Sequence, residues 1–325
     1  MVRKIAVICA SLAMSTITAA FDLQGHRGAR GLAPENTLPA FARALGIGVV
    51  TLELDCAVTR DGVVVVSHDP ALNPDITRGP DGQWLEKTGP AIWSLTYAEL
   101  QRYDVGRTRP GTAYAARWPE QQPADGTRIP RLADVFALVK KSGNTTVRFN
   151  IETKISPLAP NETTTPEDFA RKLIAAIRAG GMARRATIQS FDWRTLAIVQ
   201  KEAPEIATVY LTVQKGFMDS IQADQPGSPW TAGHRFRDHG SVPRMVKAAG
   251  GAVWSPYYAE ITREQVKEAQ SLGLKVVVWT ANEPADMRRM IEWRVDGVIS
   301  DRPDLLRKVA GEIGLVLPPS TPVVP

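Results

Sequence analysis

Three acidic residues within apolar runs that could form β-strands are the first candidates for a functional site in this sequence. Glu53 and Asp55 lie two positions apart in the apolar run 49–55, so they would share one face of a strand. Glu152 lies in a second apolar run, 147–153. Carboxylates gathered inside a sheet repel one another and are costly to desolvate. We therefore expect a positive group to hold them.

This set of acids indicates a hard cation. If the two strands end at the same rim of a sheet, Glu53, Asp55 and Glu152 converge with Lys154 beside them. The set contains no cysteine and no pair of histidines at metal-binding spacing, so Mg2+ or Ca2+ suits it better than zinc. The alternative is an ion pair in which Lys154 alone neutralises the buried acids.

Two histidines are candidates for acid and base catalysis. His26 and Arg27 follow the first apolar run, and Asp61-Gly62 predicts a tight turn into a returning strand that brings His68 to the same rim. Histidine titrates near neutral pH, and the planar fork of Arg27 matches phosphate oxygens. A place at the carboxyl-terminal rim of a barrel favours a catalytic role over a structural one.

The elements that must position these side chains alternate between strand and helix from Phe21 onward. Eight strands are expected, which is the count of a closed parallel barrel built from right-handed βα units. The expected strands are 23–26, 49–55, 147–153, 187–191, 208–212, 252–255, 275–280 and 297–300. The expected helices run from Asn36 or Thr37 to Gly46 and over 132–141, 169–179, 262–272 and 285–293.

Two long stretches interrupt this alternation. Residues 69–130 are rich in Pro, Gly and Trp with one short helix expected over 96–103, and residues 214–241 are polar. Loops of this length are usually functional or disordered, so we predict two insertions above the barrel, the first serving as a lid region. The predicted barrel domain spans 21–310, and the proline-rich tail 311–325 is expected to fray.

Composition and charge narrow the class of protein. The chain has 325 residues, of which 44% are hydrophobic and 22% charged, which excludes collagen-like, disordered and disulfide-dense chains. A formal net charge of +5 is too mild a bias to indicate a nucleic-acid partner. No run after the first 20 residues is long and apolar enough for a membrane helix, so no stable membrane span is expected.

The first 20 residues are typical of a secretory signal peptide. Arg3 and Lys4 precede an apolar stretch, and the segment ends in small residues at Ala20. Cleavage there would leave Cys56 as the one cysteine, so no internal disulfide is expected. We predict a secreted protein, located in the periplasm if the source is Gram-negative.

The ordered motifs closely resemble those of the glycerophosphodiester phosphodiesterases over about residues 23–306. The opening motif is His26-Arg27-Gly28 followed, after five residues, by Pro34-Glu35-Asn36-Thr37. The later motifs are Glu53-x-Asp55, Thr59-x-Asp61-Gly62 with His68-Asp69, Ile151-Glu152-x-Lys154, Gln189-Ser190-Phe191, Trp279-Thr280-x-Asn282 and 296–303. Each motif alone is weak, but the complete set in this order is specific.

The resemblance implies a TIM (β/α)8 barrel with a small insertion after the second strand. It implies one divalent ion on Glu53, Asp55 and Glu152, and His26 with His68 as the acid/base pair. It further implies that Arg27 and Lys154 bind the phosphate of a small-molecule glycerophosphodiester, which is hydrolysed to glycerol 3-phosphate and an alcohol.

Side chains near other strand ends are candidates for the wall of the substrate pocket. Phe191 and Trp279 could contact the substrate, as could Trp254 and Tyr257, although aromatic residues there also serve barrel packing. Gln189 and Asn282 could donate hydrogen bonds into the pocket. Two smaller expectations are that Glu35-Asn36 shapes a turn and caps the helix, with direct catalysis as the alternative, and that Asp301 orients Lys154 or caps the last helix.

Two other functions are compatible with the same residues. One is a phospholipase D-like hydrolase of lysolipid or sphingolipid head groups, which a wide apolar groove formed by 69–130 would favour over a closed polar lid. The other is a non-catalytic barrel that binds a phosphate ligand, for which loss of an acidic or histidine site residue would be the signature. The ligands do not distinguish Mg2+ from Ca2+, and the sequence does not determine the oligomeric state.

Overall fold

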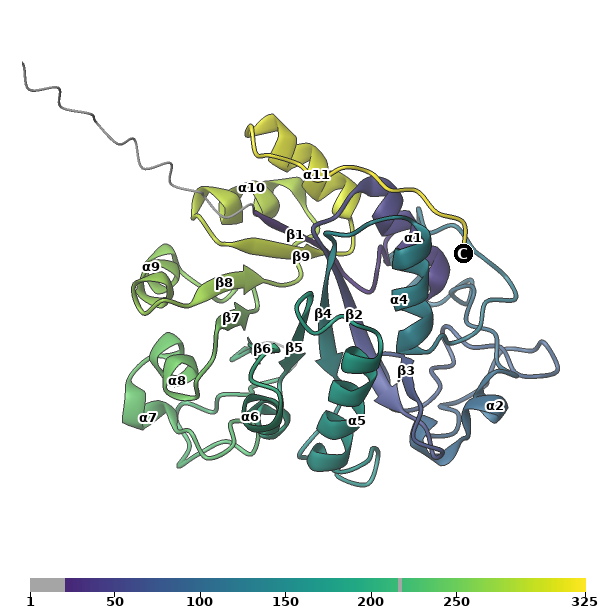
Figure 1. Ribbon diagram of the computed structural model, residues 1–325, viewed down its shortest axis with the longest axis horizontal. Coiled ribbons are helices and arrows are strands. Elements are labelled where there is room, and N and C mark those ends of the chain that lie inside the picture. Colours follow the sequence, from purple (N-terminus) through teal and green to yellow (C-terminus); the bar gives the residue numbers. More distant parts are fainter. Residues whose placement is uncertain (1–20, 216–217) are drawn as a thin grey trace, which may run out of the picture.

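Eight parallel strands close into a barrel, as predicted. The computed structural model describes residues 21–215 and 218–325, so the expected leader 1–20 lies outside the described residues. The strands follow the order β1-β9-β8-β7-β6-β5-β4-β2, and pairing of β1 with β2 closes the ring (Figure 1). Their bounds are β1 Asp22–Gly25, β2 Thr51–Val58, β4 Arg148–Thr153, β5 Ala186–Ser190, β6 Ala207–Thr212, β7 Val253–Pro256, β8 Lys275–Val278 and β9 Gly297–Ser300.

Helices surround the barrel, one main helix after each parallel strand (Figure 1). Their bounds are α1 Leu38–Ile47, α4 Leu132–Lys141, α5 Pro166–Ala179, α6 Trp193–Glu202, α8 Val242–Ala248, α9 Arg263–Ser271, α10 Pro284–Glu292 and α11 Pro303–Glu312. Of the helices described, not one combines the length and the apolar character that crossing a membrane requires.

The start and end of α1 show how local sequence sets these elements. Thr37, in extended conformation, accepts a hydrogen bond from the backbone of Ala40. Pro39 lies in the first turn, where a backbone N–H has no acceptor within the helix, so the missing N–H of proline costs nothing. Gly48 ends the helix in left-handed conformation, which glycine adopts without steric cost. Thr37, rather than Asn36, is therefore the capping residue.

Three of the main helices, α6, α8 and α11, were given no bounds in the expected set, and α11 was implied only as a last helix that Asp301 could cap. In α6 the buried residues are Trp193, Thr195, Leu196 and Val199, and the capping residue is Asp192. The seven residues of α8 begin at the edge of the polar stretch 214–241, after Ser241 as capping residue. In such helices, most of the stability comes from packing of the apolar face against the barrel rather than from intrinsic propensity.

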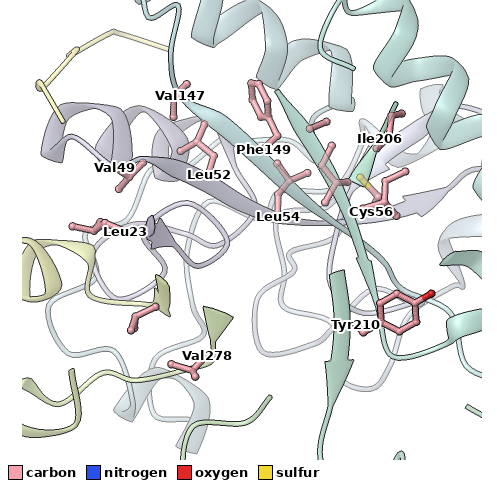
Figure 2. Packing of buried hydrophobic residues seen from close by; sticks show 14 of the residues in the cluster. Leu23, Val49, Leu52, Leu54, Cys56, Val147, Phe149, Ile206, Tyr210 and Val278 are labelled. Atoms are coloured by element: carbon pink, nitrogen blue, oxygen red, sulfur yellow. The ribbon is translucent and has the colours of Figure 1, made fainter. Parts of the chain in front are cut away.

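The alternation along β2 separates core from site as expected. Leu52, Leu54 and Cys56 pack into the hydrophobic layer between barrel and helices, together with Phe149 of β4 (Figure 2). Glu53 and Asp55 lie on the other face, toward the barrel lumen. The register pairs Asp55 with Glu152, so both acids lie at the same level of the barrel.

Both insertions contain structure of their own. β3 Val64–Val66 returns antiparallel along β2, as predicted, and is followed by η1 Ile92–Ser94, α2 Tyr97–Leu100 and α3 Ala113–Ala116. The first insertion has a small hydrophobic core with β2 and β3, made of Ala57, Val65, Leu72, Ile92, Leu100, Val105 and Ile129. The second insertion contains α7 Phe236–His239.

The carboxyl-terminal tail does not fray, in contrast to the expectation. The backbone of Thr321 donates to Leu45 of α1 at 2.9 Å, and Lys141 of α4 donates to the carbonyl of Val324 at 2.9 Å. Arg307 donates to the carbonyl of Pro318 at 2.8 Å. These contacts tie the tail to the outer helices, which composition alone does not reveal.

Close approach of the backbone at the end of β1 makes Gly25 a sensitive position. A Cβ on Gly25 would lie 2.1 Å from the carbonyl oxygen of Gly28, far inside van der Waals contact. We expect Gly25→Ala to lower the free energy of unfolding by about 2 kcal/mol or more, in the range of overpacked cores. Thermal and urea unfolding would measure it.

Gly46 provides the matched control, because it lies in α1 and a Cβ there would meet nothing within 4 Å. Gly46→Ala should leave stability unchanged or raise it by up to about 1 kcal/mol, since alanine favours helix. Equal stability of Gly25→Ala and wild type would contradict this account of the loop.

Candidate active site

The three predicted acids converge at the mouth of the barrel. Glu53 and Asp55 come from β2 and Glu152 from β4, and one ligand oxygen of each lies within 4.8 Å of the others. The side chains are buried, at 1%, 1% and 7% exposure. Neighbouring parallel strands in register therefore deliver three carboxylates to one point.

Nearby donors hold the acids in place but do not balance their charge. Lys154 Nζ donates to Glu152 at 2.8 Å and lies 3.9 Å from Asp55 Oδ1. Arg27 Nε lies 3.3 Å from Asp55 Oδ2. The amide of Gln189 donates to Glu53 at 2.7 Å. Arg27 and Lys154 supply two positive charges for three carboxylates, so a deficit of positive charge remains. The alternative in which Lys154 alone neutralises the acids is therefore insufficient.

The protonation of the acids reflects this deficit. Burial and the neighbouring Asp55 raise the pKa of Glu53 well above its usual value. Burial likewise raises the pKa of Glu152 to about 7 against the pull of Lys154. Arg27 overcomes burial at Asp55 and lowers the pKa of that carboxyl. Such mutual repulsion is what a bound cation would relieve.

The residues present fit a divalent metal ion. Asp55 Oδ1 is buried and has no hydrogen-bond partner, so it is a ligand atom without another task. All three candidate ligands are carboxylate oxygens, which are typical of hard cations. The cluster can therefore hold a metal ion.

Each predicted catalytic histidine is oriented by an aspartate. His26 Nδ1 donates to Asp301 at 2.6 Å, and His68 Nδ1 donates to Asp69 at 2.8 Å. Because a carboxylate only accepts, the proton is on Nδ1 and Nε2 keeps a free lone pair. His26 Nε2 lies 3.9 Å from Glu53. The two imidazoles border the same cavity as Glu53 and Glu152, in similar tautomers.

Burial lowers the pKa of both histidines. Burial is the largest cause at His26, where Asp301 partly offsets it. At His68, burial together with Arg27 and Lys154 lowers the pKa to about 4. Both shifts favour the neutral imidazole, which is the form that can accept a proton.

Asp301 has a different role from the two that its position suggested. It accepts from His26, from Arg30 Nε at 2.7 Å and from Asn282 Nδ2 at 2.8 Å, and it does not contact Lys154. The capping position of α11 is Arg302. Its place directly after β9, beside β1, brings Asp301 to His26, and adjacency of the first and last strands is a tertiary property.

Glu35 and Asn36 also do more than shape a turn. Glu35 accepts from Arg27 Nη1 at 2.6 Å, and Asn36 Nδ2 donates to Asp55 at 2.9 Å. Arg27 lowers the pKa of Glu35 although burial opposes this. The residues after Gly28 therefore return to the acidic cluster and orient its members.

A cavity of about 460 Å³ opens over the cluster. Its wall contains His26, Arg27, Glu53, His68, Glu152, Lys154, Gln189, Phe191 and Trp279, which are all the predicted site residues except Asp55. Phe191 and Trp279 meet edge to face at 5.4 Å between ring centroids. The amide of Gln189 is shared with Glu53 and with Asn150 at 2.8 Å, so it mainly orients the acid.

Several wall residues carry no motif in the sequence. They are Arg30 from the first loop, Arg117 from the first insertion, Glu162 from the loop after β4, and Met218 and Trp230 from the second insertion. Trp254 and Tyr257 are not among the wall residues, and Trp254 instead donates to Thr212 inside the barrel at 2.9 Å. Of the five wall residues without a motif, only Trp230, a tryptophan within the polar second insertion, could have been singled out from the sequence.

Known proteins with similar sequences belong to the family that the motifs resemble. The model of the glycerophosphoryl diester phosphodiesterase family matches residues 26–305. A glycerophosphodiester phosphodiesterase of Caldanaerobacter subterraneus subsp. tengcongensis is 31% identical over 282 residues, covering 86% of this chain and 94% of that relative. A glycerophosphodiester phosphodiesterase of Bacillus subtilis is 28% identical, covering 87% and 84%.

Solved structures share the fold. A chain from Silicibacter pomeroyi, provisionally named a glycerophosphoryl diester phosphodiesterase, is 34% identical with a TM-score of 0.82, covering 92% of this chain and 95% of that one. A phosphodiesterase of Oleispira antarctica, solved with the product sn-glycerol-3-phosphate, has a TM-score of 0.63 at 20% identity, covering 89% and 96%. The family match spans nearly all of the described barrel, and this chain belongs to the glycerophosphoryl diester phosphodiesterase family.

Proposed function

We propose that this phosphoric diester hydrolase converts glycerophosphodiesters such as glycerophosphocholine or glycerophosphoethanolamine to glycerol 3-phosphate and an alcohol. The observation that carries the proposal is the convergence of three buried carboxylates and two histidines on one cavity. The family membership and the relatives of the same name support this substrate class.

The phosphate would lie between the cations of the cavity wall. Arg27 and Lys154 both line the cavity, and each is fixed by an acid, Arg27 by Glu35 and Lys154 by Glu152. Attack on phosphorus adds negative charge to the phosphate oxygens, and preorganised cations stabilise that charge without rearranging. Their role is thus to bind the diester and to favour its transition state.

The two histidines would move the protons. One Nε2 accepts the proton of the attacking oxygen, and the other imidazole, which takes up a proton on Nε2 from solvent, donates that proton to the leaving alcohol oxygen. The attacking group is water or the neighbouring glycerol hydroxyl, which would give a cyclic phosphate first. Asp301 and Asp69 bind each ring through Nδ1, which leaves Nε2 of both histidines available.

Glu53, Asp55 and Glu152 would hold one divalent cation, Mg2+ or Ca2+. When bound, such an ion supplies a Lewis acid that polarises a phosphoryl oxygen. Removing it would restore the repulsion that raises the pKa of Glu53 and Glu152.

The cavity wall bears on the two alternative functions. The first insertion contributes Pro70 and the exposed Arg117 to the wall, and these two residues do not form the wide apolar groove that an acyl chain would need. The second insertion contributes the apolar residues Met218 and Trp230. Turnover of lysophosphatidylcholine in the same assay tests the phospholipase D-like alternative. A non-catalytic barrel is disfavoured because the acids and both histidines are present and adjacent.

We also propose that the protein acts outside the cytoplasm. Only the sequence of residues 1–20 supports this, through its basic start, apolar stretch and small residues. Sequencing the amino terminus of the mature protein from its host would test it.

Chelation should abolish activity. Hydrolysis of glycerophosphocholine should stop with EDTA and return when Mg2+ or Ca2+ is added back, because the acids repel one another without a cation. Asp55→Asn should weaken metal binding measured by calorimetry by at least about tenfold. Glu205→Gln, which alters an exposed ion pair with Arg178, is the control. Full activity in EDTA would refute the metal site.

Removal of either histidine should slow turnover. We expect His26→Ala and His68→Ala each to lower kcat by roughly 10²- to 10⁴-fold, the range for general acid or base catalysis. His239→Ala, in the second insertion and not among the cavity wall residues, should keep wild-type kcat. Near-normal turnover by both site variants would exclude the acid/base proposal.

Loss of the Asp301 carboxylate should misorient His26. Asp301→Asn should lower kcat by about 10²-fold or more with a smaller effect on KM, because the ring loses its tautomer-fixing acceptor. Asp304→Asn, which loses an ion pair with Arg302 at the start of α11, should retain kcat. Steady-state kinetics with a melting curve for each variant would show whether Asp301 acts through His26 or only through stability.

A further inference from the structure

A segment of the first insertion folds back onto the loop that carries Arg27. This strap segment, residues 112–122, contains α3 and begins at the capping residue Thr112. The backbone of Gln122 donates to the carbonyl of Leu32 at 3.0 Å, and Gln121 Nε2 donates to the carbonyl of Arg30 at 2.7 Å. The strap segment is therefore bound to the loop after β1 along its length.

Trp118 of the strap segment covers Arg30. The guanidinium carbon of Arg30 lies 4.6 Å from the ring centroid, within the range of a cation–π contact. Arg30 in turn holds Asp301 through Nε at 2.7 Å and Nη2 at 3.0 Å. The strap segment thus supports the partner of His26.

Tyr114 of the strap segment contacts Glu35, the acid that holds Arg27. Its phenol donates to Glu35 Oε2, while Glu35 Oε1 accepts from Arg27 Nη1 at 2.6 Å. Glu35 is 7% exposed, so each oxygen needs a donor from the protein. One carboxylate therefore links the insertion to the phosphate-binding arginine.

Arg27 depends on this link because it lies between two acids. Its Nη1 contacts Glu35 and its Nε lies 3.3 Å from Asp55, where no hydrogen bond forms. If Glu35 rotates away, the fork turns toward Asp55 and the acidic cluster, and its donors no longer meet phosphate oxygens. The phenol of Tyr114 is hydrogen-bonded to Glu35 Oε2, whereas Arg30 Nη1 lies 3.9 Å from that oxygen, so the phenol is the contact that would oppose this rotation.

We infer that Tyr114 is a positioning residue of the active site, which fixes Arg27 for phosphate binding through Glu35. The inference deepens the proposed function and rests on it. The first insertion then acts as a brace for the phosphate site, in addition to any part it has in covering the cavity.

The test compares Tyr114→Phe with Tyr103→Phe. Tyr103 belongs to the same insertion but packs against the insertion's own small core. With glycerophosphocholine, Tyr114→Phe should lower kcat/KM by roughly tenfold, because a buried carboxylate oxygen loses its donor. The inhibition constant of glycerol 3-phosphate should rise in parallel, and both variants should remain folded at the temperature of the assay.

A double-mutant cycle shows whether Tyr114 acts through Glu35. If it does, Glu35→Gln with Tyr114→Phe should lower kcat/KM no further than Glu35→Gln alone. Multiplying effects in the double variant would overturn the inference. So would kinetics of Tyr114→Phe equal to those of Tyr103→Phe, or a loss of activity that only follows a loss of folded protein.

Failure of the proposed function can be recognised separately. If the wild-type protein hydrolyses no glycerophosphodiester, that function is wrong, and calorimetry with inorganic phosphate then decides the role of Tyr114. Weaker phosphate binding by Tyr114→Phe than by Tyr103→Phe would support the inference, whereas equal or absent binding in both would overturn it.

Discussion

The mutual repulsion of three carboxylates in a closed barrel is the constraint on which the site depends. Glu53, Asp55 and Glu152 are buried within 4.8 Å of one another, and burial makes each charge expensive unless a cation is near. Arg27 and Lys154 offset part of the charge, and Asp55 Oδ1 remains without a hydrogen bond. A bound divalent ion would offset the remaining repulsion between the carboxylates, and it fits the residues present.

The same constraint explains why the surrounding charges are paired outward from the cluster. Arg27 is shared with Glu35, and Arg30 is shared with Asp301, so these two cations are each held by a further acid, whereas Lys154 pairs with Glu152 and Asp55 of the cluster itself. Isolated cations would fall onto the cluster and occupy the place of a metal ion or phosphate. Acids in a second layer keep them at a set distance, and Asp301 also fixes the tautomer of His26.

Most of the fold and the reacting groups follow from patterns of period two along single strands. The alternation Glu53-Leu54-Asp55 predicted which side chains face the lumen, and Asp61-Gly62 predicted the return of His68. The role of Asp301 could not be predicted, because it depends on β9 lying beside β1, which joins residues distant in sequence. Helices α6, α8 and α11 were given no bounds, and Trp230 was missed because the position of a loop residue follows no periodic pattern.

This division between strands and loops has a consequence for substrate choice. The carboxylates and Lys154 come from strands or their immediate ends, where the barrel fixes them, whereas Arg117, Met218 and Trp230 of the cavity wall come from the two insertions. Loop residues can change without moving a strand, so the wall can adapt to different alcohols while the phosphate chemistry is preserved. The first insertion is less free than the second to vary, because Tyr114 and Trp118 contact the residues that hold Arg27 and His26.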